Sequence, residues 1–344
     1  MPALCTNRPS WLSAEVKVGM SAVAVPGIGV GTWAWGNQFL WGYDPAQDQQ
    51  LQATFTGAVE LGLRFFDTAD SYGTGRLQGR SEALLGRFCS ALAPEQRHGL
   101  CVATKLAPFP WRLGRGGFRR AFAASRSRLG GQLDRVQLHW STARYAPWQE
   151  GPLLDGLADL VREGAVASLG LSNFGPQRLR QVHQRLSACG VKIDSLQVQL
   201  SLLAPAPVAP GGVSDVCREL GIPLIAYSPL ALGLLARASG SAENQASLQR
   251  TRRLLFARLQ PRITPLLDLL QALARERQVS QAAVALNWCR SHGAMPIVGL
   301  RSIAQAEAAA AAAQWCLSEA ERQALDQVAM DLPVAMPANP FCSR

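Results

Sequence analysis

The feature that most constrains the fold is a regular alternation of short apolar runs with longer amphipathic stretches. In the amphipathic stretches the apolar residues recur at helical spacing, as in the segment 153–161. The expected strands comprise one within 21–33, where a hairpin precedes it, and then 63–66, 100–104, 135–138, 166–171, 194–199, 222–227 and 294–298. Eight strands that alternate with helices imply a parallel sheet, and this number of units indicates closure into a (β/α)8 TIM barrel, an α/β fold.

The expected helices lie near 47–62, 80–91, 116–129, 151–163, 176–189, 212–220 and 262–278, with an alanine-rich helix from 303. Two segments lie outside the alternation. Residues 228–261 form a long polar connection, and connections of this length are often functional lids. An extra C-terminal helix is expected at about 318–329. Because no domain boundary is visible, we expect a single barrel domain over residues 1–344, with its core at about 18–330.

The composition excludes several classes of protein. Of the 344 residues, 48% are hydrophobic and 17% are charged, which is typical of a folded protein with a large core. No run approaches the ~20 apolar residues that a membrane helix needs. The first twenty residues show neither a signal pattern nor a clear transit peptide, so a cytoplasmic location is expected.

The charged residues and the cysteines also argue against two kinds of site. The net charge of +10 comes from dispersed arginines, which is a weak indication for nucleic acid but favours an anionic small ligand. The eight cysteines form no CxxC pair and have no companion histidines at metal-binding spacing. We therefore expect neither a metal site nor a nucleic-acid partner.

Polar residues come where the apolar runs end. They are Asp67, Lys105, His139, Ser172 with Asn173, Gln199, and Tyr227 with Ser228. Successive gaps of about 27 to 38 residues match one strand-plus-helix unit. In a barrel, all these positions meet on the rim formed by the C-terminal ends of the strands, where such folds place their active sites.

The residue types in this set predict a particular chemistry. Lys105 is one of only three lysines in a chain rich in arginine, and lysine is the more compact and tunable base. Tyr72 follows Asp67 by five residues and, with a reference pKa near 10, is a poor acid at neutral pH. A nearby ammonium group favours its phenolate, and a carboxylate bonded to that ammonium keeps the lysine charged. His139 could orient a substrate oxygen from the other side. Asp70, in the same stretch, is expected to be only a turn residue.

Such a site would protonate an oxygen atom that becomes an alkoxide while a hydride arrives at carbon. None of the four residues is a hydride source, so a reduced nicotinamide is required. Asn173 and Gln199 could bind its carboxamide, and Tyr227 could stack on its ring.

Seven segments, "DTADSYG", "VATK", "QLHW", "GLSNFG", "QVQLSLL", "AYSPLALGLL" and "PIVGLRS", together resemble the aldo-keto reductase superfamily over residues 18–330. That superfamily is an (α/β)8 barrel that reduces aldehydes and ketones with NADPH. The resemblance implies that Tyr72 is the general acid and that Asp67, Lys105 and His139 complete its tetrad.

The resemblance also implies the cofactor contacts. Ser172, Asn173 and Gln199 would contact the nicotinamide amide, Tyr227 would stack on the ring, and Ser228, Leu230 and Gly233 would cover the pyrophosphate. Gly299, Arg301, Ser302 and Gln305 would bind the adenosine phosphate, with Arg301 suited to the 2′-phosphate of NADPH. The chain departs from the family pattern at Ala308 and Ala309, where Glu and Asn are usual, so adenine contacts made there by other members are in doubt.

Further segments resemble one subgroup of the superfamily, the plant plastid pyridoxal reductases and their cyanobacterial relatives. They are "WAWGNQFLWGYDP", "SYGTGRLQGRSEALLGRF", "LHWSTARYAPWQ" and "NWCRSHGAMPIVG". Five aromatic residues that follow expected strands, Trp33, Trp35, Phe109, Trp111 and Trp140, could line a substrate pocket. Such a pocket fits a flat pyridine aldehyde, which would place the protein in vitamin B6 metabolism, and it also fits other hydrophobic carbonyl compounds.

Two other functions remain open from the sequence. Lys105 at the end of a barrel strand could form a Schiff base, as in an aldolase. Alternatively, the protein could be an NADPH-binding regulatory subunit with little turnover, since some members of the superfamily have this role. In the reductase interpretation the partner is a small-molecule carbonyl substrate, and the protein is a monomer or a weak homo-oligomer.

Overall fold

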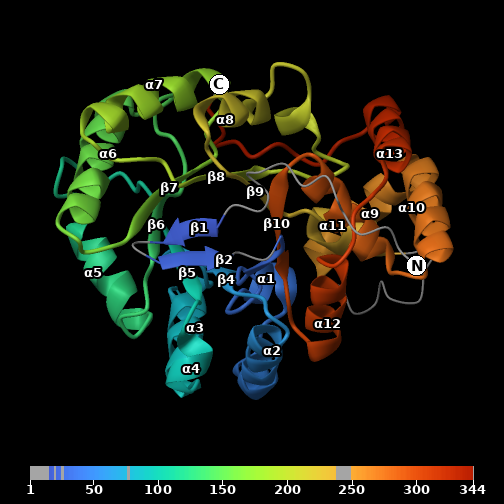
Figure 1. Ribbon diagram of the computed structural model, residues 1–344, viewed down its shortest axis with the longest axis horizontal. Helices are drawn as coiled ribbons and strands as arrows, with labels where there is room; N and C mark the ends of the chain where they lie inside the picture. The colour runs from blue at the N-terminus through green and yellow to red at the C-terminus, as the bar shows by residue number, and fades with distance from the viewer. Residues whose placement is uncertain (1–14, 19–20, 25–26, 76–77, 238–248, 344) are drawn as a thin grey trace.

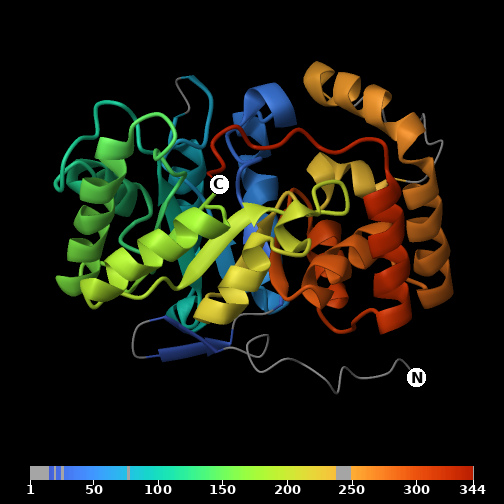
Figure 2. The same cartoon turned by 90° about the horizontal axis from the view of Figure 1, so that it is seen from above.

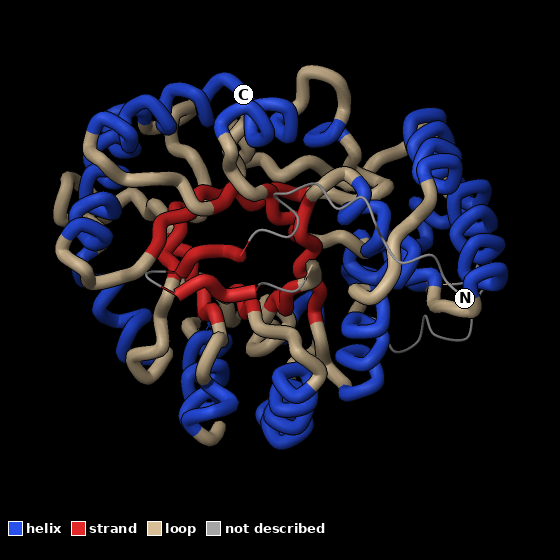
Figure 3. Tube along the Cα trace, in the orientation of Figure 1, coloured by secondary structure: helices blue, strands red, loops and turns tan. Residues whose placement is uncertain are grey.

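A computed structural model describes residues 15–18, 21–24, 27–75, 78–237 and 249–343 (Figure 1). Eight parallel strands close into a barrel in the order β10, β3, β4, β5, β6, β7, β8, β9. Their bounds are β3 (Gly29–Gly31), β4 (Phe65–Asp67), β5 (Cys101–Leu106), β6 (Arg135–Leu138), β7 (Ser168–Ser172), β8 (Ser195–Gln199), β9 (Leu224–Tyr227) and β10 (Ala294–Gly299). Figure 3 shows this ring of strands with helices around it. The predicted (β/α)8 barrel is confirmed.

The strands are buried on both faces, as expected when helices cover a parallel sheet. All six residues of β5 are buried, and so are all residues of β4, β6 and β7. The register pairs Lys105 with Gln137, and Gln199 with Tyr227. Because neighbouring strands run parallel in this register, the polar residues at their C-terminal ends converge on one rim of the barrel.

Helices cover the outside of the barrel. Those that the sequence predicts are α2 (Asp48–Glu60), α3 (Arg80–Ala91), α5 (Arg119–Arg128), α6 (Pro147–Arg162), α7 (Pro176–Ala188), α8 (Val213–Leu220), α10 (Thr264–Arg277) and α12 (Ile303–Ala312). Proline stands in the first turn of α6, α7 and α10, where its missing N–H costs no hydrogen bond. Ser302 caps α12 by accepting a hydrogen bond from the backbone of Gln305.

The structure contains elements that the sequence did not reveal. They are α1 (Gln38–Trp41), α4 (Pro94–Arg97), α9 (Arg250–Leu259), α11 (Gln281–Ser291) and the 3-10 turns η1 (Pro45–Gln47), η3 (Ala206–Val208), η4 (Ala231–Ala236) and η5 (Gln260–Arg262). Residues 283–290 of α11 are all buried, so this helix has no polar face and no amphipathic pattern. The connection 228–261 is partly helical, because it contains η4, α9 and the start of η5. Its residues 238–248 lie outside the described part of the chain.

The N-terminal hairpin and the C-terminal tail lie at opposite ends of the barrel (Figure 2). The hairpin of β1 (Glu15–Val18) and β2 (Ser21–Ala24) starts earlier than the predicted 21–33 and lies at the lower end in Figure 2. Helix α13 (Glu319–Asp331) is the predicted extra helix, and Ser318 and Glu321 form a capping box at its start. The tail after α13, residues 332–343, crosses the upper end in Figure 2, on the side of the rim described above. Among the described residues, no helix has the length and apolarity to cross a membrane.

Candidate active site

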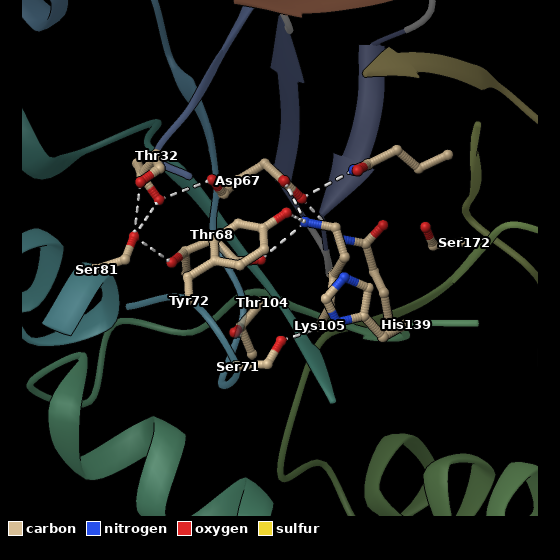
Figure 4. A network of polar contacts seen from close by, with 12 residues as sticks. Thr32, Asp67, Thr68, Ser71, Tyr72, Ser81, Thr104, Lys105, His139 and Ser172 are labelled. Carbon is tan, nitrogen blue, oxygen red and sulfur yellow. Dashed lines mark hydrogen bonds and ion pairs between the residues drawn. The ribbon is translucent and has the colours of Figure 1, made fainter. Parts of the chain in front are cut away.

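Asp67 is the last residue of β4 and is almost completely buried. Its backbone oxygen accepts hydrogen bonds from the backbone N–H of Thr32, at 2.9 Å, and from the Thr32 hydroxyl, at 3.0 Å. These bonds continue the pairing of β3 with β4 past the end of the strand, and the carboxylate faces the Lys105 ammonium group (Figure 4).

The Asp67 carboxylate is held between a cation and two amides. One oxygen forms an ion pair with the Lys105 ammonium group, and the other accepts 2.9 Å hydrogen bonds from the Nε2 atoms of Gln137 and Gln197. Lys105 Nζ also donates to the backbone oxygen of Thr68 at 2.9 Å. A buried ion pair is stable only when its remaining polar atoms are hydrogen-bonded, and here these partners are present.

The environment keeps Lys105 charged. Burial lowers the pKa of the lysine, but the charges of Asp67 and Tyr72 and hydrogen bonds to both outweigh burial, so the net shift is upward. A Schiff base requires a neutral amine, so this setting opposes the aldolase alternative.

Tyr72 lies in the loop after β4, and its side chain reaches Lys105. The backbone N–H of Asp70 donates to the Lys105 oxygen at 3.0 Å, and the N–H of Tyr72 donates to the Ala69 oxygen at 3.1 Å. This turn brings the Tyr72 hydroxyl to 3.2 Å from Lys105 Nζ (Figure 4). Burial raises the pKa of Tyr72, and the Lys105 charge opposes that rise without reversing it. Tyr72 is therefore protonated and can donate its proton. The expected lowering of its pKa by Lys105 is outweighed by burial.

His139 follows β6 and faces Tyr72 across the site, with 5.8 Å between the ring centroids. Its Nδ1 atom lies 3.3 Å from the Ser71 hydroxyl. Burial, and then the charge of Lys105, lower the pKa of His139 well below its usual value. The imidazole is therefore neutral at physiological pH, and it can orient an oxygen atom without adding a second cation.

The residues expected to contact a nicotinamide lie next to this group. Asn173 has a left-handed backbone (φ 64°), and its Nδ2 donates to the His139 oxygen and to the Ser172 hydroxyl. The Tyr227 hydroxyl donates to Asn173 Oδ1 at 2.8 Å, and Gln199 Nε2 donates to the Pro337 oxygen at 3.3 Å. The structure thus brings Ser172, Asn173 and Tyr227 together, and Gln199 is at the end of the neighbouring strand β8.

Two adjoining cavities lie beside Asp67, Tyr72 and Tyr227 and beyond them. The larger, of about 430 Å³, is lined by Asp67 and Tyr72 and by the predicted residues Tyr227, Ser228, Leu230, Gly233, Gly299, Arg301 and Gln305. The smaller, of about 270 Å³, is lined by Arg301, Ser302 and Gln305 and by residues of η1 and α2. Arg301 and Gln305 line both. Of the two positions that depart from the family pattern, Ala309 is buried in α12 and Ala308 is exposed.

The five predicted aromatic residues do not share one pocket. Trp33 lines the larger cavity, 6.5 Å from the Tyr72 ring, and Trp140 lies 5.0 Å from the His139 ring. Phe109 packs edge-on against Trp140, and Trp111 stacks on the outer side of Phe109 with most of its side chain exposed. The prediction for Trp35 is wrong. Its indole is completely buried in the core, where Nε1 donates to the Leu300 oxygen and the ring packs on Phe88.

Asp70 lies in a turn, as expected, but its side chain has a structural role as well. Its side chain is buried, accepts a hydrogen bond from the Ala107 backbone and forms an ion pair with Arg112. These bonds fasten the loop after β5, which carries Phe109 and Trp111. Asp70 therefore anchors the wall of the pocket.

Two groups of residues at the site were not predicted from the sequence. Gln137 and Gln197 stand inside apolar strands, two residues before His139 and Gln199, and that placement was the available signal. The C-terminal tail gave no signal. Asn339 Nδ2 donates to the Tyr227 hydroxyl at 2.8 Å and to Asn173 Oδ1 at 3.1 Å, and Phe341 stacks on Trp140 at 4.6 Å.

Comparison with known proteins agrees with this geometry. The model of the "Aldo/keto reductase family" matches residues 27–330. This chain belongs to the aldo/keto reductase family. It is thus an oxidoreductase that reduces aldehydes or ketones with NADPH. The larger cavity, beside Asp67 and Tyr72, and the smaller one that adjoins it both have cationic and polar side chains in their linings, as such a cofactor needs.

Individual relatives cover nearly the whole chain. Pyridoxal reductase, chloroplastic, from Arabidopsis thaliana is 44% identical over 333 residues, which are 95% of this chain and 90% of the relative. A 6-dehydroglucose reductase from Novosphingobium aromaticivorans is 29% identical, covering 84% of this chain and 86% of the relative. Among solved structures, an aldo/keto reductase from Klebsiella pneumoniae in complex with NADP and acetate superimposes with a TM-score of 0.70 at 26% identity, covering 96% of this chain and 99% of that one.

Proposed function

We propose that this aldo/keto reductase reduces pyridoxal, or a similarly flat aromatic aldehyde, to the alcohol, with Tyr72 as the general acid. The observation that carries the proposal is the hydroxyl of Tyr72 lying 3.2 Å from the ammonium of Lys105, which is itself ion-paired with buried Asp67. The aromatic rings of Trp33, Phe109 and Trp140 near Tyr72 and His139 support this substrate class, and so does the relative named pyridoxal reductase.

In this proposal NADPH supplies the hydride that reaches the carbonyl carbon. Tyr72 gives its proton to the carbonyl oxygen, so the alcohol forms and the tyrosine is left as a phenolate. Lys105 stabilises that negative charge, and Asp67 keeps the lysine charged and in place. Neutral His139 donates a hydrogen bond that orients the oxygen beforehand.

The cofactor contacts are proposed from the positions of the predicted residues. Ser172, Asn173 and Gln199 bind the carboxamide, and Tyr227 supports the ring. The segment 228–233 covers the pyrophosphate. Arg301, with Ser302 and Gln305, binds the 2′-phosphate and so favours NADPH over NADH. Because Ala308 and Ala309 have no polar side chain, adenine receives no hydrogen bond from them.

The substrate proposal is tested by measuring NADPH oxidation with pyridoxal, simple aromatic aldehydes, methylglyoxal and aliphatic aldehydes. We expect the highest kcat/KM with pyridoxal or another aromatic aldehyde, because Trp33, Phe109 and Trp140 offer flat apolar surfaces. A clear preference for methylglyoxal or aliphatic aldehydes would overturn the substrate assignment and leave the reductase assignment intact.

The two alternatives have their own tests. Borohydride added with a carbonyl substrate leaves no adduct on Lys105 in a reductase, whereas a Schiff-base enzyme would be trapped. A regulatory NADPH-binding subunit would oxidise NADPH no faster with aldehydes than without them.

The proposal also covers the domain organisation, the location, the oligomeric state and the partners of the protein. We infer a single domain over residues 1–344, a cytoplasmic location, and a monomer or weak homo-oligomer without nucleic-acid or membrane partners. The pyridoxal substrate would give the enzyme a role in vitamin B6 metabolism. Light scattering after size exclusion tests the oligomeric state, and fractionation of cells tests the location.

A further inference from the structure

A buried arginine at the larger cavity has no role in the site described so far. Arg252, on α9, has only 7% of its surface exposed and lines the cavity together with Arg301. Its Nη2 atom donates to the Leu232 oxygen at 2.7 Å, while its buried Nε has no hydrogen-bond partner. An unsatisfied buried polar atom is rare in native proteins, so it indicates a partner that binds there.

The charge of Arg252 is also uncompensated. No ion pair within the described part of the chain joins Arg252 or Arg301 to a carboxylate. Burial, and then the charges of Arg301 and Arg237, lower the pKa of Arg252 to about 10. The group therefore remains charged at neutral pH in a place where protein groups disfavour its charge. An anion would relieve both the desolvation and the repulsion.

The aromatic ring of Trp41 contacts both arginines. The Arg252 guanidinium lies 4.1 Å from the Trp41 ring centroid, and the Arg301 guanidinium lies 5.6 Å from it. Arg301 Nη1 also donates to the Trp41 backbone oxygen at 3.2 Å. Cation–π contacts of this kind fix a guanidinium group without neutralising it. Both guanidinium groups thus keep their charge in the lining of one cavity.

Arg252 is tied to the loop after β9. The backbone in that loop is left-handed at Ala231, Leu232 and Gly233, with φ between 47° and 96°. A side chain on Gly233 would approach Arg252 Nη2 to 3.2 Å. Left-handed residues other than glycine cost of order 1–3 kcal/mol each and persist where the surroundings impose them. This conformation turns the Leu232 oxygen toward Arg252 and leaves the cavity beside the arginine open.

We propose that Arg252 is a binding residue for the diphosphate group of the cofactor, acting separately from Arg301 at the 2′-phosphate. The inference rests on the proposed cofactor site. The ligand class is a diphosphate ester, and the guanidinium supplies the charge-assisted hydrogen bonds that such a group prefers.

The test compares the affinities for NADPH and NADH, measured by quenching of tryptophan fluorescence and by calorimetry. Arg252→Gln removes the charge and keeps a donor for the Leu232 oxygen. We expect it to weaken NADPH and NADH by the same factor, about 10- to 100-fold, as for loss of a charged hydrogen-bonding partner. Arg301→Gln should weaken mainly NADPH, because only NADPH has the 2′-phosphate. Arg252→Lys should recover part of the affinity for both.

The controls separate this proposal from its alternatives. Arg253→Gln removes the same charge from an exposed neighbour on α9 and should leave both affinities unchanged. If Arg252 only holds the loop, Arg252→Gln will bind like the wild type, and the proposal is overturned. A loss confined to NADPH would also overturn it, since Arg252 would then serve the 2′-phosphate. If the wild type binds neither nucleotide, the proposed cofactor site itself fails. If Arg252→Gln does not fold, Arg252→Lys decides: the ammonium keeps the charge but lacks the planar fork of donors, so the affinity for both cofactors should fall by one smaller factor, and wild-type affinity for both contradicts the proposal.

Discussion

Burial and nearby charges together determine the charge states of Tyr72, His139 and Lys105. Burial lowers the pKa of His139 and raises that of Tyr72, while the partners of Lys105 more than offset burial and raise its pKa. At neutral pH the site therefore holds a protonated phenol, a neutral imidazole and an ammonium group paired with Asp67. This is the protonation state that an acid catalyst for carbonyl reduction needs before each turnover.

Asp70 gives a pH dependence of stability that can be predicted with its sign. Burial raises its pKa to about 6, although Arg112 opposes the rise. The folded protein thus binds more protons than the unfolded chain between about pH 4 and 6, and its free energy of unfolding falls as pH rises through this window. A shift of this size corresponds to roughly 3 kcal/mol.

Urea unfolding of the wild type and of Asp70→Asn at pH 4.5 and 7 measures this effect. When the pH is raised from 4.5 to 7, the contribution of Asp70 is lost, so the free energy of unfolding should fall by more in the wild type than in Asp70→Asn. Asp215→Asn, at an exposed ion pair, is the control and should behave like the wild type. Equal pH dependence in wild type and Asp70→Asn would show that Asp70 is not responsible.

The two tryptophans Trp35 and Trp140 should respond differently to truncation. Trp35→Ala removes a buried core indole and its hydrogen bond to Leu300, and should lower the free energy of unfolding by about 3–5 kcal/mol. Trp140→Ala should cost much less stability and should raise KM for aromatic aldehydes. Denaturant titration and steady-state kinetics check both, and a raised KM at wild-type stability for Trp35→Ala would contradict the placement of Trp35.

At the scale of elements, the strands and most helices were predictable because each shows its own local pattern. Residues such as Asp67, Lys105 and His139 were predictable because the barrel converts equal spacing in sequence into proximity. Helix α11 was not, since it is buried on all sides and shows no periodicity. The tail was not, because Asn339 reaches Asn173 and Tyr227 only through contacts that no local pattern encodes. Trp35 had the right spacing but faces the core.

The tail yields a prediction of its own. Asn339→Ala removes hydrogen bonds to the Tyr227 hydroxyl and to Asn173 Oδ1, so the side chains of these two proposed nicotinamide contacts lose orientation. We expect NADPH affinity to fall several-fold, in line with about 1 kcal/mol per neutral hydrogen bond. Ala338→Ser, at an exposed neighbouring position, is the control. Tighter NADPH binding in Asn339→Ala would mean instead that the tail competes with the cofactor.

For the whole molecule, the net charge of +10 should accelerate the encounter with an anionic cofactor. Raising the ionic strength screens this attraction, because the Debye length falls from about 10 Å at 0.1 M to about 3 Å at 1 M. The association rate of NADPH, followed by stopped-flow fluorescence, should therefore fall with salt. KM for a neutral aldehyde should change little, and a salt-independent NADPH rate would remove the role given to net charge.

The most direct test of the account is single-turnover reduction by Tyr72→Phe with saturating NADPH and aldehyde. Phenylalanine keeps the ring and removes only the proton donor 3.2 Å from Lys105. We expect the rate of NADPH oxidation to fall by roughly 10²- to 10⁴-fold while NADPH affinity stays close to that of the wild type. Near wild-type oxidation in Tyr72→Phe would contradict the assignment of Tyr72 as the acid.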